Sequence, residues 1–215
     1  MTNDIALSNS TNHFLQVAQE IQSSELGGRL MKFVKGHYNM GDDEVPADGE
    51  FVAHVHKLLR GYVKFGGGKL IEQRLGKVAE GFQVPKREEL GDTDQTSWER
   101  DVNGNPRDPW ALQYYLPLEN SETGEVSVFV TSSHGGFDAI GNLCTVFARN
   151  VKNGLPVIKL GTSSYRHRTY GRIAIPDFPV VGWNKAGADT GVVDDDDDMV
   201  QVVSPSEDMD DACPF

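Results

Sequence analysis

The chain has 215 residues, of which 38% are hydrophobic and 24% charged, so it is long enough for one folded domain with a core. It has no apolar run of the length that a membrane span needs, and its N-terminus lacks a basic region followed by an apolar one. Its two cysteines, Cys144 and Cys213, do not form a metal-type pair. We therefore expect a cytoplasmic protein that is not held in a membrane.

The formal net charge of −12 argues at first against a nucleic-acid partner, but the acidic residues are unevenly placed. Residues 189–215 contain ten acids and no base, and residues 1–25 contain three acids and no base. The stretch 26–188 holds nineteen acids and all 20 bases, so it is close to neutral. This division predicts a flexible N-terminal arm or short helix at 1–25, a folded domain at 26–188 and a disordered acidic tail at 189–215.

Alternation of apolar and polar residues predicts strands at 29–35, 51–65, 69–78, 110–118, 125–132, 155–160 and 170–183. The last of these is interrupted by Pro176 and Pro179. Gly66, Gly67 and Gly68 predict a tight hairpin turn between the second and third strands. The segment 36–49 is typical of an acidic loop, and 80–109 of a long surface insertion held by Phe82 and Trp98.

One helix is predicted at 137–151, because its apolar residues recur three or four positions apart. The order of elements therefore indicates a mainly β domain with one inner helix. An oligonucleotide-binding (OB) type of five-stranded barrel, with 80–109 as its insertion, fits this order, and a β-sandwich can be built from the same segments.

Two segments combine basic and aromatic residues, which single-strand binding needs for phosphate contacts and base stacking. The first hairpin offers Arg60, Tyr62, Lys64, Phe65, Lys69 and Arg74. The second segment has no acid from residue 139 to 176 and offers Arg149, Lys152, Tyr165, Arg166, Arg168, Tyr170 and Arg172. The competing interpretation is that the charges are solvated surface groups and the aromatic rings belong to the core. A single binding track further assumes that both segments share one face.

No catalytic, metal or cofactor pattern stands out. His54 and His56 are close in sequence, but no third ligand follows at a usual spacing. The Gly-rich turn at 66–68 lacks the lysine and the helix of a phosphate loop. We therefore expect a protein that is not an enzyme and that needs neither a metal nor a cofactor.

The acidic tail ends in an unusual way. Five aspartates at 194–198 are followed by a second acidic group and by Cys213-Pro214-Phe215 at the end. An aromatic ring next to a terminal carboxylate, behind a stiff proline, suits a pocket that recognises a chain end. Asp208, Asp210, Asp211, Pro214 and Phe215 resemble the C-terminal tip of bacterial single-stranded DNA-binding proteins, and some phage proteins of that class end similarly.

The resemblance implies a protein, encoded by a bacterium or a phage, that coats single-stranded DNA through residues 26–188 without strong sequence preference. It also implies that the tip recruits replication, recombination or repair proteins, and it leaves a homo-oligomer possible. The alternative is an acidic module without affinity for single strands, whose aspartates imitate a DNA backbone and sequester a basic partner.

Overall fold

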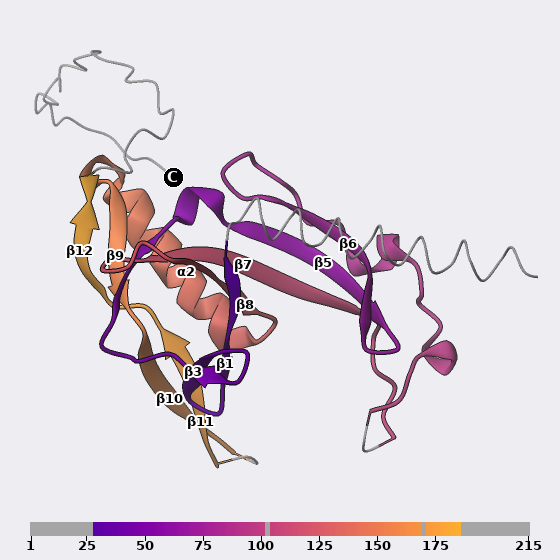
Figure 1. Cartoon of the computed structure of the whole chain (residues 1–215). Coiled ribbons are helices and arrows are strands. Elements are labelled where there is room, and N and C mark those ends of the chain that lie inside the picture. The colour runs from indigo at the N-terminus through magenta and orange to yellow at the C-terminus, as the bar shows by residue number, and fades with distance from the viewer. Residues whose placement is uncertain (1–27, 102–103, 169–170, 186–215) are drawn as a thin grey trace, which may run out of the picture.

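The structure is a computed structural model that describes residues 28–101, 104–168 and 171–185. The predicted arm at 1–25 and the predicted tail at 189–215 therefore lie outside the described residues. Within them the chain is mainly β, with one α-helix (Figure 1).

Ten strands form one sheet in the order β12-β9-β4-β7-β8-β1-β2-β3, and β5 and β6 join it beside β7. Two further strands, β10 and β11, form a separate antiparallel ribbon. The bounds are β1 Arg29–Val34, β2 His37–Met40, β3 Asp43–Glu44, β4 Glu50–Ala53, β5 Leu59–Gly66, β6 Lys69–Lys77, β7 Trp110–Asn120, β8 Val126–Thr131, β9 Leu155–Lys159, β10 Gly161–His167, β11 Gly171–Asp177 and β12 Val180–Asn184. The pairing of β1 with β8 is parallel, and the other pairings are antiparallel.

Helix α2 (His134–Arg149) fills the hollow side of the curled sheet. It begins at His134, three residues earlier than the apolar spacing predicts, and the side chain of its N-cap residue Ser133 accepts a hydrogen bond from the backbone N–H of Gly136. Its face carrying Ala139, Ile140 and Leu143 joins the core. The sheet side of that core is built from Met31, Phe51, Leu116, Leu118, Phe129 and Ile158.

The mainly β fold with one inner helix is confirmed, and the sheet is an open, curled half-barrel. The five-stranded OB barrel is not confirmed, because ten strands take part and the described sheet ends in β12 on one side and β3 on the other. The predicted strands at 29–35, 69–78, 110–118, 125–132 and 155–160 are confirmed to within two residues.

The single strand predicted at 51–65 is wrong, because the segment divides into β4 and β5 around a short 3₁₀ turn at Val55–Lys57. Both strands pair with the same edge of β7, on either side of Pro117. The carbonyl of Pro117 accepts a hydrogen bond from the His54 N–H at 3.0 Å on that edge. A proline has no N–H to return there, so the ladder is interrupted where the chain leaves it.

The loop predicted at 36–49 is also wrong in part, because it contains β2 and β3. Tyr38 in β2 is buried, and its hydroxyl donates to the Gly161 carbonyl at 2.7 Å. Burial raises the pKa of this phenol. A single buried aromatic between polar neighbours gave too little periodicity for the sequence to reveal a strand.

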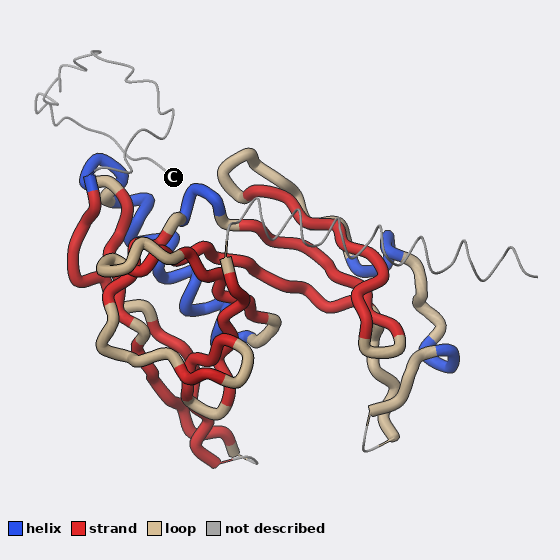
Figure 2. The backbone as a smooth tube through the Cα atoms, in the orientation of Figure 1, coloured by secondary structure: helices blue, strands red, loops and turns tan. Residues whose placement is uncertain are grey.

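Strands β5, β6 and the first half of β7 extend from the body as a three-stranded arm (Figure 1). The turn between β5 and β6 is made by Gly67 and Gly68, both with positive φ, as predicted. The segment between β6 and β7 is largely irregular, with 3₁₀ turns at Arg87–Leu90 and Gln95–Ser97 and a bridge between Arg100 and Pro106 (Figure 2).

Candidate nucleic-acid interface

The β10–β11 ribbon projects from the body but has a fixed base (Figure 1). The Tyr38 hydroxyl bonds Gly161 at the start of β10 and accepts from the Asp177 N–H at 3.2 Å at the end of β11. Ile175 packs so closely on Gly135 of α2 that a Cβ at this glycine would lie 2.4 Å from the isoleucine side chain. These contacts hold the ribbon while its outer half extends into solvent.

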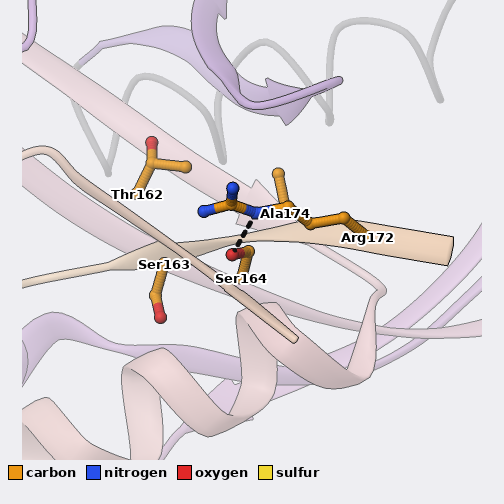
Figure 3. A pocket seen from close by; sticks show the side chains of 5 residues that line it. All are labelled: Thr162, Ser163, Ser164, Arg172 and Ala174. Atoms are coloured by element: carbon orange, nitrogen blue, oxygen red, sulfur yellow. Dashed lines mark hydrogen bonds between the residues drawn. The ribbon is translucent and has the colours of Figure 1, made fainter. Parts of the chain in front are cut away.

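The register of the ribbon assigns its side chains to two faces, because residues directly opposite one another share a face. We call one of them the arginine face; it consists of Thr162, Ser164, Arg166, Arg172, Ala174 and Pro176. Tyr165 lies opposite Ile173 on the other face and is 48% exposed. Figure 3 shows Ser163 pointing away from Thr162, Ala174 and Arg172.

Arg166 and Arg172 are directly opposite in the register, which places two positive charges side by side. Like charges at such positions destabilise a ribbon unless a counter-charge is supplied. Neither arginine forms an ion pair with another described residue. Nε of Arg172 donates to the Ser164 hydroxyl at 2.8 Å, which orients its guanidinium along the ribbon (Figure 3). An anion from outside the described fold would supply the counter-charge of the two arginines.

Two shallow hollows lie along the ribbon. One, of about 500 Å³, is lined by Thr162, Ser163, Ser164, Arg172 and Ala174. The next, of about 540 Å³, is lined by Ser164, Tyr165, Arg166, Gly171 and Arg172. Ser164 and Arg172 belong to both, so they form the wall between two adjacent depressions.

Three of the four basic residues predicted in the first hairpin, Arg60, Lys64 and Arg74, are engaged within the molecule. Nζ of Lys64 pairs with Asp92 at 2.8 Å, and Nε of Arg74 pairs with Glu72 at 2.9 Å. Arg60 donates to the carbonyl of Phe82 at 3.0 Å. Of the other residues predicted there, Tyr62 and Phe65 are half-buried in β5 and Lys69 is exposed at the start of β6.

The 80–109 insertion packs on the arm and supplies two of these partners, Asp92 and Phe82, whereas Glu72 belongs to β6. A Cβ on Gly76 would lie 2.2 Å from the ring of Phe82, so the ring packs directly on β6. The indole N–H of Trp110 donates to the Asp92 carboxylate at 3.0 Å, and the hydrogen bond from Lys64 is the main reason why the pKa of Asp92 is lowered. Phe82 thus holds the insertion as predicted.

A second set of contacts lies within the insertion itself. Both Nε and Nη2 of Arg87 donate to the two carboxylate oxygens of Asp108 at 2.7 Å, and this pairing raises the pKa of Arg87. The guanidinium also lies over the ring of Trp98, 5.8 Å from its centroid, and that indole donates to the Asp92 carbonyl at 2.7 Å. Trp98 therefore contacts other residues of the insertion.

Arg149 and Lys152 lie at the far end of α2 from the ribbon. Arg149 lies 14 positions after Gly135 in the helix, a rise of about 21 Å. Both basic residues are exposed and make no ion pair with another described residue. The structure therefore brings Arg166, Arg172 and the adjoining Arg168 to one ribbon, and the arm points in another direction (Figure 1).

Some predicted residues cannot be placed. Tyr170 and the tail residues Asp208, Asp210, Asp211, Pro214 and Phe215 lie outside the described residues.

Three residues at the ribbon were missed by the sequence analysis. Thr162 and Ser164 lie on the arginine face, and Thr162 donates to the carbonyl of Gly36 at 3.2 Å. The neighbouring Lys35 has a φ of 51°, a conformation that a lysine rarely adopts. The Lys35-Gly36 pair between two short β-type runs is the signal that could have predicted this turn.

The two histidines set aside as metal ligands are adjacent in space. Nε2 of His54 lies 2.9 Å from a carboxylate oxygen of Glu119, and the His54 and His56 rings are 5.6 Å apart. Burial is the main reason why the pKa of His56 is lowered. Over residues 28–101, 104–168 and 171–185, no group of three or more His, Cys, Asp and Glu side chains is arranged to hold a metal ion.

Comparisons with known proteins find no match to a family model, a curated protein or a solved structure. In the described part of the chain, no helix is both long and apolar enough to cross a membrane.

Proposed function

We propose that this protein binds single-stranded DNA through the β10–β11 ribbon. The observation that carries the proposal is the cross-strand pair Arg166–Arg172, two adjacent cations without a counter-charge among the described residues. Arginine forms bidentate hydrogen bonds to phosphate, so a polynucleotide backbone supplies the missing negative charge.

Tyr165 adds a stacking surface on the other face of the same ribbon. Its half-exposed ring suits an unpaired base, which stacks on an aromatic side chain whatever its sequence. A strand that passes around the ribbon would place phosphates on the arginine face and a base on this tyrosine. Such contacts bind single strands without strong sequence preference.

The acidic tail is assigned to protein recruitment. Its sequence tip, with Asp210, Asp211, Pro214 and Phe215, supports docking of replication, recombination or repair proteins on the coated strand. This function belongs in the cytoplasm of a bacterium or of a phage-infected cell. An OB-like barrel is the finer fold hypothesis, supported by the curled, strand-rich sheet around one helix.

The test is a titration of the full chain with labelled oligo(dT), duplex DNA and RNA across a salt series. We expect the tightest binding to oligo(dT), weakening as salt rises, because phosphate contacts release counter-ions. Equal or tighter binding to duplex DNA would mean that the ribbon binds a groove of duplex DNA instead. Absence of binding to all three nucleic acids would reject the proposal and favour an acidic module that sequesters a basic protein.

A further inference from the structure

The arginine face has a regular spacing of hydrogen-bond donors. Its rungs are the pairs Arg166–Arg172 and Ser164–Ala174, followed by Thr162 opposite a proline. Rungs on one face of a strand are two residues apart, roughly 6.8 Å. This spacing is similar to that between successive phosphates of a stretched polynucleotide strand.

The outer rung, Arg166–Arg172, borders the hollow of about 540 Å³, which we call the outer seat. Arg166 and Arg172 enter from opposite strands, and Gly171 leaves the space beside them open, since a Cβ there would touch nothing within 4 Å. One phosphate between the two guanidiniums would accept from both and remove their mutual repulsion.

The depression that includes Thr162 and Ala174 is the inner seat. Arg172 reaches it from the shared wall, and its bond from Nε to the Ser164 oxygen leaves the hydroxyl hydrogen of that serine free to donate. The β1–β2 turn lies against Ala174, one of its lining residues, because a Cβ on Gly36 would lie 3.5 Å from that of Ala174.

The same turn carries a cation. Lys35 is exposed and adjoins Gly36, and both have positive φ, at 51° and 93°. Glycine or asparagine suits the first position of such a turn better than lysine does. Backbone strain of this kind is found at ligand-binding sites, so we expect Lys35 to take part in binding.

We propose that the two seats hold two successive phosphates of one strand, the first between Arg166 and Arg172 and the second at Ser164 and Lys35. The inference rests on the proposed function and deepens it, because it assigns the arginine face to the phosphates of the strand and leaves base stacking to Tyr165. Ser164 and Lys35 are then backbone-binding residues, and the bases stay outside both seats.

The experiment uses the full chain with three probes: inorganic phosphate, tripolyphosphate and an abasic oligodeoxynucleotide. We expect tripolyphosphate to bind at least tenfold more tightly than phosphate, because it spans both seats. Backbone amide signals of residues 162–164 and 171–174 should shift in NMR spectra. The abasic strand should bind, and Lys35→Gln should lower its logarithmic salt slope by roughly 0.7.

Ser164→Ala should weaken binding of tripolyphosphate severalfold. The matched control for Lys35→Gln is Lys57→Gln, an exposed lysine in the 3₁₀ turn between β4 and β5, which should leave binding unchanged. Thermal unfolding of each variant separates lost binding from lost folding. Equal affinity for phosphate and tripolyphosphate, or unchanged binding by both seat variants, overturns the inference. If oligo(dT) binds and the abasic strand does not, the two seats are rejected while the proposed function stands. If neither strand binds, both fail.

Discussion

Removing the positive charges of the ribbon should change how strongly DNA binding depends on salt. The perturbation is the triple substitution Arg166→Gln, Arg168→Gln and Arg172→Gln, which keeps long polar side chains. If Arg166 and Arg172 together neutralise one phosphate of a single strand and Arg168 neutralises another, the slope of log K against log salt should fall by roughly 1.4 in magnitude. Between 50 and 200 mM salt, wild-type affinity should then drop about sevenfold more than that of the variant.

The assay is fluorescence anisotropy of labelled oligo(dT) with the full chain. The matched control removes the same charge elsewhere, through Lys57→Gln, Lys86→Gln and Arg107→Gln, all exposed and distant in sequence from the ribbon. The control should keep nearly the wild-type slope. Equal slopes for the ribbon variant and the wild type would refute the reasoning, because general electrostatics rather than a located site would then explain binding.

The same ribbon variant has an expected effect on stability. Since Arg166 and Arg172 face each other as like charges, their neutralisation should leave the thermal midpoint unchanged or raise it. A clear fall in the midpoint would mean that the pair stabilises the fold, and the functional interpretation would lose its main support.

Three further predictions concern the ring, the insertion and the base of the ribbon. Tyr165→Ala should weaken oligo(dT) binding by about 1–3 kcal/mol, measured by the same anisotropy titration, while affinity for an abasic strand stays the same. Because pairing with Lys64 lowers the pKa of Asp92, the stability from this pair is present above the ordinary pKa of 3.8 and is lost as pH falls through the lower folded value. Asp92→Asn suits the φ of 49° and should reduce the difference in urea midpoint between pH 7 and pH 3. Gly135→Ala should destabilise the fold by about 1–3 kcal/mol by pushing into β11, whereas Gly141→Ala, with open space around it, should be neutral or stabilising in chemical denaturation.

Much of the fold follows from local sequence patterns. The strands at β1, β6, β7, β8 and β9 and the helix α2 were predicted because a buried face imposes a period of two or of about 3.6 residues. β10 was missed as a strand, because Gly161-Thr162-Ser163-Ser164 carries no apolar alternation. β10 is a strand because it pairs with β11 in the ribbon, and its own sequence does not show this pairing.

The candidate site depended more on long-range contacts. Nothing in the sequence around Lys64 shows that Asp92, 28 positions later, would neutralise it. The insertion folds back on the arm, so Asp92 pairs with Lys64 and the Phe82 carbonyl accepts from Arg60, two basic residues that looked available for DNA. Conversely, the segment without acids from residue 139 to 176 contains Arg166 and Arg172, which make no ion pair with another described residue, although its Lys159 pairs with Glu50.

To predict that Arg166 lies opposite Arg172, one would need the register of the ribbon. That register is set where β10 begins and β11 ends. The Tyr38 hydroxyl is hydrogen-bonded to Gly161 and Asp177, the first and last residues of the ribbon, although Tyr38 lies more than 120 residues earlier in the chain. Spacing along the sequence could place two arginines near each other, but it could not place them on one face.

The central claim is most directly tested by ultraviolet cross-linking of oligo(dT) to the full chain, followed by mass spectrometry of the peptides. The account predicts that the cross-linked peptide contains Tyr165, from the β10–β11 ribbon. A cross-link confined to Tyr62 or Phe65 in the arm, with none in residues 161–177, would contradict it.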